Sequence, residues 1–198
     1  MSPEMWRVFI AVELPNPPLS LLSRTQADLK RQAPAGSVRW VAPEGIHLTL
    51  KFLGDVPVTD LDAVRSAMSE AARGHTPFTL ETGSLGCFPN ATRPRVIWIG
   101  IERSRSALNA LRDAVETHVA PLGYPTEDRP FSPHLTLGRV RPEARRDALA
   151  KLGTLLSDKP TTEHETWTVD RISLMRSELK PGGAVYTEIG QSLLHPSE

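Results

Sequence analysis

The sequence lacks the features of a secreted or membrane protein. It contains one cysteine, Cys87, so no disulfide can form within the chain. No apolar run approaches the roughly 20 residues that span a bilayer. The stretch MSPEMWRVFIAVELP at the N-terminus lacks the charged start and the apolar core of a signal peptide. We therefore expect a cytoplasmic protein that does not bind membranes.

The sequence also lacks an excess of charge of either sign. Its 23 Lys and Arg residues equal its 23 Asp and Glu residues, so the formal net charge is zero. Bulk charge therefore does not indicate binding to nucleic acid or to a membrane surface, and any phosphate ligand must be bound by a local group of residues. With 39% hydrophobic residues, the chain of 198 residues can bury an ordinary globular core.

What the sequence does contain is an internal repeat. The tetrapeptide HLTL occurs at residues 47–50 and again at residues 134–137. The segment RVFIAVE starts 40 residues before the first histidine, and the similar segment RVIWIGIE starts 39 residues before the second. Two unrelated halves would not keep such offsets. We therefore predict a single domain over residues 1–198 that consists of two similar halves, roughly residues 7–90 and 95–190.

Each half is predicted to form a strand, a helix, a strand, a helix and a further strand. Short apolar runs at residues 9–12 and 96–101 predict buried strands, and apolar residues at helical spacing predict helices over residues 19–31, 60–72, 104–119 and 143–156. Residues 171–176 and 184–189, separated by the turn sequence KPGG, are predicted to form a β-hairpin. We expect an α+β fold of two pseudo-symmetric lobes, with mainly antiparallel sheets flanked by helices and an active-site cleft between the lobes.

The alternation of side chains along a strand turns the repeated tetrapeptide into a candidate active site. In HLTL, the histidine and the threonine share one face and the two leucines share the other, where they can anchor the strand in the core. Two copies that face each other would gather His47, His134, Thr49 and Thr136 around one small volume. Packing alone gives no reason for a polar histidine and threonine on the opposite face of both strands. We therefore predict that the two histidines are a catalytic pair.

This set of groups suits the chemistry of a phosphodiester. One neutral imidazole can take a proton from an attacking water, and one imidazolium can give a proton to the leaving oxygen. The threonine hydroxyls can donate hydrogen bonds to the phosphate oxygens. Neither a carboxylate cluster nor a second histidine stands at metal-ligand spacing near either motif, so we expect no metal and no other cofactor.

On these motifs the sequence resembles the 2H phosphoesterase superfamily, and within it the bacterial and archaeal RNA 2′,3′-cyclic phosphodiesterases, also called 2′-5′ RNA ligases. The resemblance covers nearly the whole chain through RVFIAVELP, VRWVAPEGIHLTLKFLGDV, PRVIWIGI, FSPHLTLGRV and ISLMRSELKPGGAVYTEI. It implies metal-independent hydrolysis of a 2′,3′-cyclic phosphate at an RNA 3′ end to a 2′-phosphomonoester. In some members it also implies joining or reversal of 2′-5′ linkages.

The resemblance also implies roles for individual residues. His47 matches the proton donor to the leaving oxygen, and His134 matches the proton acceptor that activates water. Thr49 and Thr136 match the threonines that bind the phosphate. Arg139 matches an arginine that often comes after the second motif, although regular alternation points its side chain away from His134. It would reach the phosphate only through a β-bulge, which Gly138 favours, and a solvated surface arginine is an equal alternative.

Two other functions remain open at this point. A related phosphodiesterase could act on small cyclic nucleotides, and a non-catalytic module could bind RNA ends or nucleotides with the same fold. The intact histidines and threonines favour an enzyme over the binding module. We expect a monomer whose partner is RNA, or a nucleotide, that carries a 2′,3′-cyclic phosphate.

Several residues beside the motifs are candidates for contact with the substrate. Regular alternation puts Lys51 on the face of His47, where it either lines the cleft or is solvated. Phe9 and Trp40 could stack on a nucleobase, although core packing is the preferred interpretation for both. Four further arginines, Arg93, Arg95, Arg103 and Arg105, could meet an RNA backbone or could simply be solvated.

Overall fold

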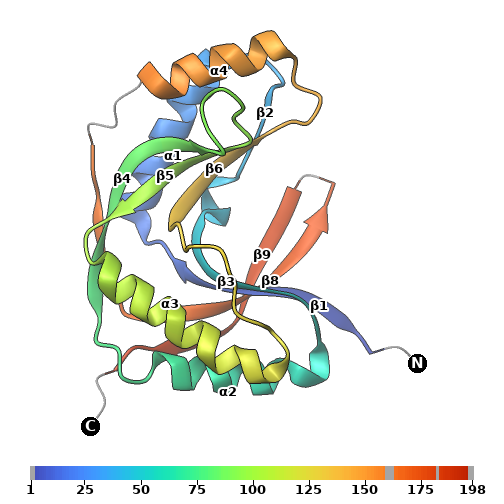
Figure 1. Ribbon diagram of the computed structural model, residues 1–198, viewed down its shortest axis with the longest axis vertical. Helices are drawn as coiled ribbons and strands as arrows, with labels where there is room; N and C mark the ends of the chain where they lie inside the picture. The colour runs from blue at the N-terminus through green and yellow to red at the C-terminus, as the bar shows by residue number, and fades with distance from the viewer. Residues whose placement is uncertain (1–2, 159–162, 182, 196–198) are drawn as a thin grey trace.

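The computed structural model describes residues 3–158, 163–181 and 183–195. Its strands form two antiparallel sheets, which we call sheet A and sheet B (Figure 1). Sheet A has the order β3 (His47–Pro57), β1 (Met5–Glu13), β8 (Arg171–Lys180) and β9 (Gly183–Leu193). Sheet B has the order β2 (Val38–Trp40), β6 (His134–Val140), β5 (Val96–Glu102), β4 (Phe78–Phe88) and β7 (Thr166–Val169).

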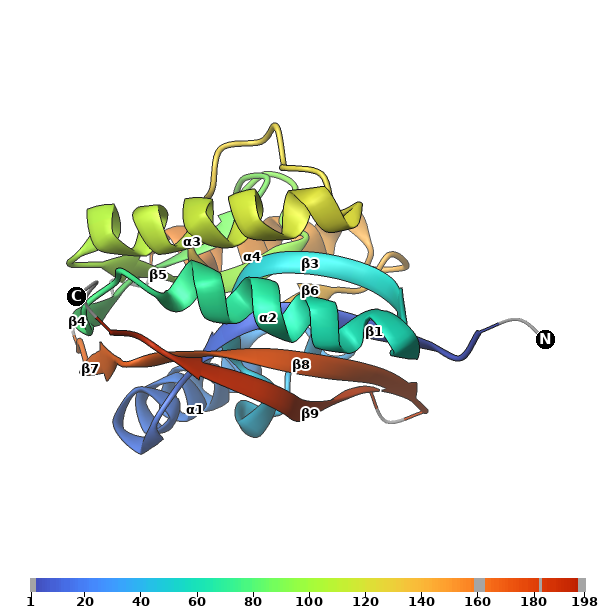
Figure 2. The same ribbon diagram turned by 90° about the horizontal axis from the view of Figure 1, so that it is seen from below.

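The four predicted helices are present, with small changes at their ends. They are α1 (Asn16–Gln32), α2 (Leu61–Ala72), α3 (Arg105–Val119) and α4 (Arg146–Asp158). Each helix buries an apolar stripe, as α3 does with Leu108, Leu111 and Val115. Helices α2 and α3 lie side by side against sheet A, whereas α1 and α4 pack against sheet B (Figures 1 and 2). The predicted α+β class with antiparallel sheets and flanking helices is confirmed.

The predicted hairpin at the end of the chain is also confirmed. Strands β8 and β9 pair antiparallel over their whole length. Gly182 of the predicted KPGG turn lies outside the described residues. Among the helices in the described ranges, none has the length and the apolar character that crossing a bilayer requires.

The third strand of each half of the sequence pairs with the other half. Strand β4 belongs to the first half but pairs with β5, and β8 belongs to the second half but pairs with β1. Each sheet is thus built from both halves, and buried apolar residues from both form one continuous core. This exchange of strands ties the two sheets together, so neither sheet can form from one half of the chain.

The two HLTL strands lie close to each other, although they belong to different sheets. Strand β3 is at the edge of sheet A and β6 is inside sheet B, and Cα atoms of the two strands come within 8 Å of each other. The leucines of both motifs, Leu48, Leu50, Leu135 and Leu137, are buried in the core as predicted. The fold therefore brings the two motifs to one region of the molecule.

Candidate active site

The two motif histidines are held by the same hydrogen bond. His47 Nδ1 lies 2.9 Å from the carbonyl oxygen of Gly45, and His134 Nδ1 lies 2.7 Å from that of Ser132. A carbonyl oxygen only accepts, so Nδ1 must carry a proton in both rings. In each histidine this leaves Nε2 as the nitrogen that can accept or donate a proton in a reaction.

Aromatic rings fix the position of the His47 imidazole. Phe9 stacks on it with ring centroids 4.5 Å apart and planes 28° apart, and Tyr186 of β9 meets it edge-on at 4.9 Å. Phe9 is only 1% exposed. The preference for core packing of Phe9 is thereby confirmed, because a ring that is covered in this way cannot stack on a base.

The His134 imidazole has an equivalent pair of aromatic neighbours. Phe88 at the end of β4 meets it edge-on at 4.9 Å, and Trp98 of β5 lies tilted at 6.4 Å. Trp98 occupies the space above Gly86 of the neighbouring strand, where a Cβ atom would lie 2.3 Å from the indole ring. Glycine at this position therefore gives the indole room beside the histidine.

Burial favours the neutral form of both histidines. Burial lowers the pKa of His47 from 6.5 to about 4, and the hydrogen bond to Gly45 opposes part of this change. Burial also lowers the pKa of His134, against its hydrogen bond to Ser132, and the positive charge of Arg139 lowers it further. A phosphate anion beside the two rings would favour their charged forms and raise both pKa values.

Both motif strands contain a β-bulge at the same residue of the motif. In the ladder between β1 and β3, Leu50 of β3 has no partner in β1. In the ladder between β5 and β6, Leu137 of β6 has no partner in β5. The inserted residue reverses the alternation of the side chains after it. Predictions based on regular alternation therefore fail immediately after each HLTL.

The bulge at Leu50 turns Lys51 into the protein, so the prediction that it lines the cleft or is solvated is wrong. Lys51 is 3% exposed, and its Nζ lies 2.8 Å from Glu116 of α3 and donates to the carbonyl oxygen of Pro125. Glu116 also pairs with Arg112, which in turn pairs with Asp113, so each of the buried charges has an opposite partner. Phe52, which is 54% exposed, takes the place on the face of His47 that regular alternation assigned to Lys51.

The bulge at Leu137 brings Arg139 to the face of His134 and Thr136. Gly138 points inward instead, where a Cβ atom would lie 2.7 Å from Val38 Cγ1 and 3.0 Å from the half-buried ring of Trp40. Arg139 is exposed, and its charge acts on the pKa of His134. We call this face of sheet B, and the equivalent face of sheet A with His47 and Thr49, the motif faces.

Gln26 of α1 connects the second motif strand with the segment that leads to the first, and it was not among the residues predicted from the sequence. This side chain is 1% exposed, and its Nε2 donates to the carbonyl oxygens of Val41, at 2.6 Å, and Leu137, at 2.9 Å. Val41 lies on the short connection that leads to His47. The only signal in the sequence was a polar residue within the apolar stripe of a predicted helix.

Two carboxyl groups lie beside the His47 side of the site. Glu13 pairs with His47 across the β1–β3 ladder, and Ser173 Oγ lies 2.9 Å from carboxyl oxygens of both Glu13 and Glu188. One hydroxyl proton can serve only one of them, so the second contact is a hydrogen bond only when that carboxyl is protonated. Burial, together with the contact to Glu188, raises the pKa of Glu13. Within the described residues, three or more His, Cys, Asp or Glu side chains nowhere gather in an arrangement that could hold a metal ion.

Comparisons with known proteins agree with this architecture. The chain matches the family model of the 2′-5′ RNA ligase superfamily over residues 18–181. It is 35% identical over 183 residues to the RNA 2′,3′-cyclic phosphodiesterase of Methanothermobacter thermautotrophicus, which covers 92% of this chain and 96% of that protein. Its identity to the protein of the same name from Archaeoglobus fulgidus is 31%, over 92% of this chain and 97% of that protein.

Solved structures share the fold over almost the whole chain. TT0787 of Thermus thermophilus has a TM-score of 0.78 at 32% identity and covers 95% of this chain and 97% of its own. E. coli LigT in complex with 3′-AMP has a TM-score of 0.75 at 25% identity, over 96% and 99% of the two chains. The match of the family model over most of the sequence, joined to this agreement in fold, shows that the chain belongs to the 2′-5′ RNA ligase superfamily.

Proposed function

We propose that this protein hydrolyses the 2′,3′-cyclic phosphate at the 3′ end of RNA and leaves a 2′-phosphomonoester. One observation carries the proposal: the site holds two copies of the same unit. Each copy has a histidine whose Nδ1 is bound to a main-chain carbonyl, and a threonine two residues further along the strand. The names of the relatives from M. thermautotrophicus and A. fulgidus support this substrate.

The reaction needs two proton transfers, and the site has two histidines to perform them. Water attacks phosphorus and gives a proton to Nε2 of His134. The bond from phosphorus to O3′ breaks, and Nε2 of His47 gives its proton to O3′. Each transfer contributes roughly 10²–10⁴-fold to the rate. The two motifs are identical, so the assignment of donor and acceptor rests on the family resemblance.

The threonines and Arg139 bind the phosphate in this proposal. The hydroxyls of Thr49 and Thr136 donate to the two non-bridging oxygens and hold phosphorus in line with the attacking water and the leaving O3′. The guanidinium of Arg139 adds a charge-assisted hydrogen bond to the same group. Its exposed position on the motif face of sheet B supports this role.

Binding of the substrate brings about the protonation of a histidine that the mechanism requires. Before binding, the low pKa of His47, about 4, leaves its ring neutral at pH 7, so it has no proton to donate. The negative phosphate between the two rings raises the pKa of both, and one of them then binds a proton from solvent. The donor is thus charged only when there is a substrate to protonate.

The same transfers also account for ligation of RNA. If the 5′-hydroxyl of a second RNA attacks phosphorus in place of water, His134 takes the proton of that hydroxyl and the P–O3′ bond breaks as before. The product is then a 2′-5′ phosphodiester. This part of the proposal rests on the chemistry of the site and on the name of the superfamily.

The test is to incubate the protein with RNA that ends in a 2′,3′-cyclic phosphate and to identify the product. We expect a 2′-phosphate, with no loss of rate after exhaustive chelation. A 3′-phosphate product would show that the other P–O bond breaks, and loss of activity on chelation would show that a metal ion takes part.

A further inference from the structure

A pair of arginines lies directly beside the His134 half of the site. Arg39 of β2 and Arg139 of β6 are register partners in the antiparallel ladder, so both side chains project from the motif face of sheet B. Both are exposed, and among the described residues neither has a carboxylate partner. Like charges directly opposite each other destabilise a sheet. An anion bound between them would remove that repulsion.

The positive surface continues past the end of β6. Arg95 immediately precedes β5, and its carbonyl oxygen accepts a hydrogen bond from the main-chain N–H of Val140, at 2.9 Å. Arg95 and Val140 line the same pocket, so the Arg95 side chain leaves sheet B at its end, beside Val140, and an RNA chain reaches it only after passing the end of the motif face. Arg93 lies two residues earlier, and both arginines are exposed without a carboxylate partner in the described part of the chain.

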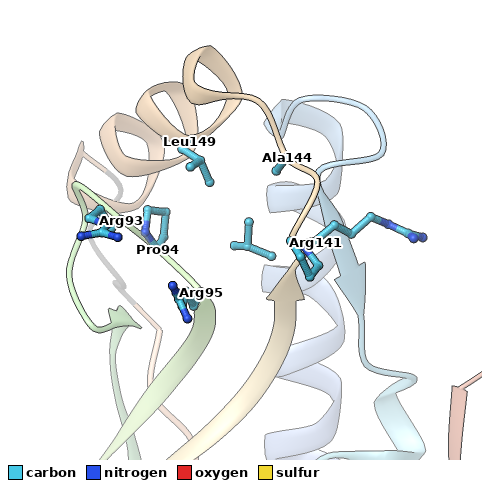
Figure 3. A pocket seen from close by; sticks show the side chains of 8 residues that line it. Arg93, Pro94, Arg95, Arg141, Ala144 and Leu149 are labelled. Carbon is cyan, nitrogen blue, oxygen red and sulfur yellow. The ribbon is translucent and has the colours of Figure 1, made fainter.

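Arg93 and Arg95 form one wall of a pocket of about 290 Å³ at this end of the sheet (Figure 3). The opposite side carries Arg141, whose guanidinium is directed away from the pocket, and Leu149 of α4 lies above it. Arg141 also pairs with Glu143, at 3.7 Å. We therefore leave Arg141 out of the group and call Arg39, Arg93, Arg95 and Arg139 the arginine strip.

Elsewhere on the surface many arginines are neutralised, as Arg73 is by Glu70 and Arg171 is by Asp170. The chain as a whole carries no net charge. Four exposed arginines at one end of sheet B, without a carboxylate partner among the described residues, therefore create a local positive potential that the composition does not reveal. The other side of the site, around His47, carries Glu13 and its neighbour Glu188 instead. These two carboxyl groups make the His47 side less favourable to a polyanion.

We propose that the arginine strip binds the backbone phosphates of the RNA chain on the 5′ side of the reacting end. The inference rests on the proposed function, because a cyclic phosphate between the two histidines fixes where the chain starts. From Thr136 to Arg139 the strand extends by at most about 10 Å, so Arg39 and Arg139 meet the chain first and Arg95 and Arg93 come next. A cyclic mononucleotide has no such chain, so it gains nothing from Arg39, Arg93 or Arg95 and meets only Arg139, which also contacts the cyclic phosphate. The protein is therefore an enzyme of polynucleotide ends.

Binding as a function of salt tests the strip without catalysis. The probe is a single-stranded RNA of about ten nucleotides with a 3′-phosphate, and its affinity is measured by fluorescence anisotropy at several salt concentrations. Each phosphate neutralised on a single strand contributes about 0.7 to the slope of log K against log salt. The double variant Arg39→Gln/Arg95→Gln should therefore bind less tightly, with a slope smaller by about 1.4.

The matched control is Arg24→Gln/Arg73→Gln, which removes the same charge from exposed positions on α1 and at the end of α2. We expect it to keep the wild-type slope. An unchanged slope of log K against log salt in the Arg39/Arg95 variant would overturn the proposal that the arginine strip binds RNA. An equal reduction of this slope in the control variant would also overturn it.

Kinetic measurements then test the role of the arginine strip independently of the proposed function. On cyclic-phosphate RNA of about ten nucleotides, the Arg39/Arg95 variant should lose about tenfold more kcat/KM than on a 2′,3′-cyclic mononucleotide. Equal losses on the two substrates would refute the strip and leave the proposed function intact. If the wild-type protein hydrolysed neither substrate, the proposed function would fail, and the salt slope would still decide whether the strip binds RNA.

Discussion

The two motif strands begin alike and then differ, and the difference starts at a shared bulge. Both present a histidine with the same main-chain hydrogen bond, a threonine, and buried leucines. After the bulge, β3 turns Lys51 inward and Phe52 outward, whereas β6 turns Gly138 inward and Arg139 outward. The residues that carry the proposed chemistry are duplicated. What distinguishes the two sides is the pair of residues just beyond each bulge.

This comparison explains how a repeated sequence forms an asymmetric site. The outward residue is an exposed aromatic ring on one side and a cation on the other. The charges of the neighbouring residues also differ between the two sides, since Glu13 lies beside His47 and Arg39 lies beside Arg139. A phosphate bound between the two histidines thus meets most of its positive charge on one side. The substrate can be oriented although the two motifs are identical.

Removal of either histidine should have the largest effect. His47→Ala and His134→Ala should each lower the turnover of cyclic-phosphate RNA by roughly 10²–10⁴-fold, because each removes one proton transfer. Single-turnover kinetics measure this loss. The control is His118→Ala on α3, an exposed histidine whose Nδ1 also bonds to a main-chain carbonyl, and it should keep full activity. A loss of turnover in only one of the two variants would show that the two motif histidines do not contribute equally to the reaction.

The second-largest effect should come from the inward residue of β3 and should be on stability, because Lys51 is part of a buried ion pair. Lys51→Ala leaves the Glu116 carboxylate buried with Arg112 as its remaining partner. We expect a loss of about 3 kcal/mol in the free energy of unfolding, the lower end for a broken buried pair. Urea denaturation measures it, with the exposed Lys151→Ala as the control. A loss no larger than that of the control would mean that the buried pair adds nothing to stability.

The outward residues should differ in which kinetic parameter they control. Arg139→Gln removes a charge-assisted hydrogen bond to the phosphate and should lower kcat/KM by about 10–100-fold on RNA and on mononucleotides alike. Phe52→Leu removes an uncharged ring, so its smaller effect should appear in KM and leave kcat almost unchanged. Steady-state kinetics on both substrates separate the two cases. Equal effects of the two variants on kcat would contradict the asymmetry.

Gly138→Ala should have the smallest effect of the series. The new Cβ would lie 2.7 Å from Val38 Cγ1, so β2 must shift. We expect a loss of about 1 kcal/mol, the lower end of the range for overpacking, and a corresponding fall in Tm. Adding Val38→Ala should recover part of that fall by removing the contact. If Gly138→Ala left the Tm unchanged, steric crowding would not be the reason for glycine at this position.

The duplicated part of the site was predictable from the sequence, but the residues beyond each motif were not. Alternation within HLTL correctly assigned the buried leucines, and amphipathic spacing correctly located the helices. Neither pattern reveals a bulge, because a bulge depends on how β3 and β6 pair with their neighbours, so Lys51 was misplaced. Gly138 hinted at the second bulge, whereas nothing beside Leu50 hinted at the first. The exchange of β4 and β8 was also beyond prediction, because local patterns identify a strand but not its partner.

The dependence of kcat/KM on pH tests the central claim, that two histidines of one site share a single acid–base reaction. In the proposed mechanism the free enzyme is active with one ring protonated and one neutral, which is the main form only between the two pKa values. Both are lowered from 6.5, that of His47 to about 4, so the bell-shaped profile should have its maximum below pH 6.5. The profile of kcat should lie at higher pH, because the bound phosphate raises both values. A kcat/KM that stayed constant from pH 4 to 8 would contradict the account.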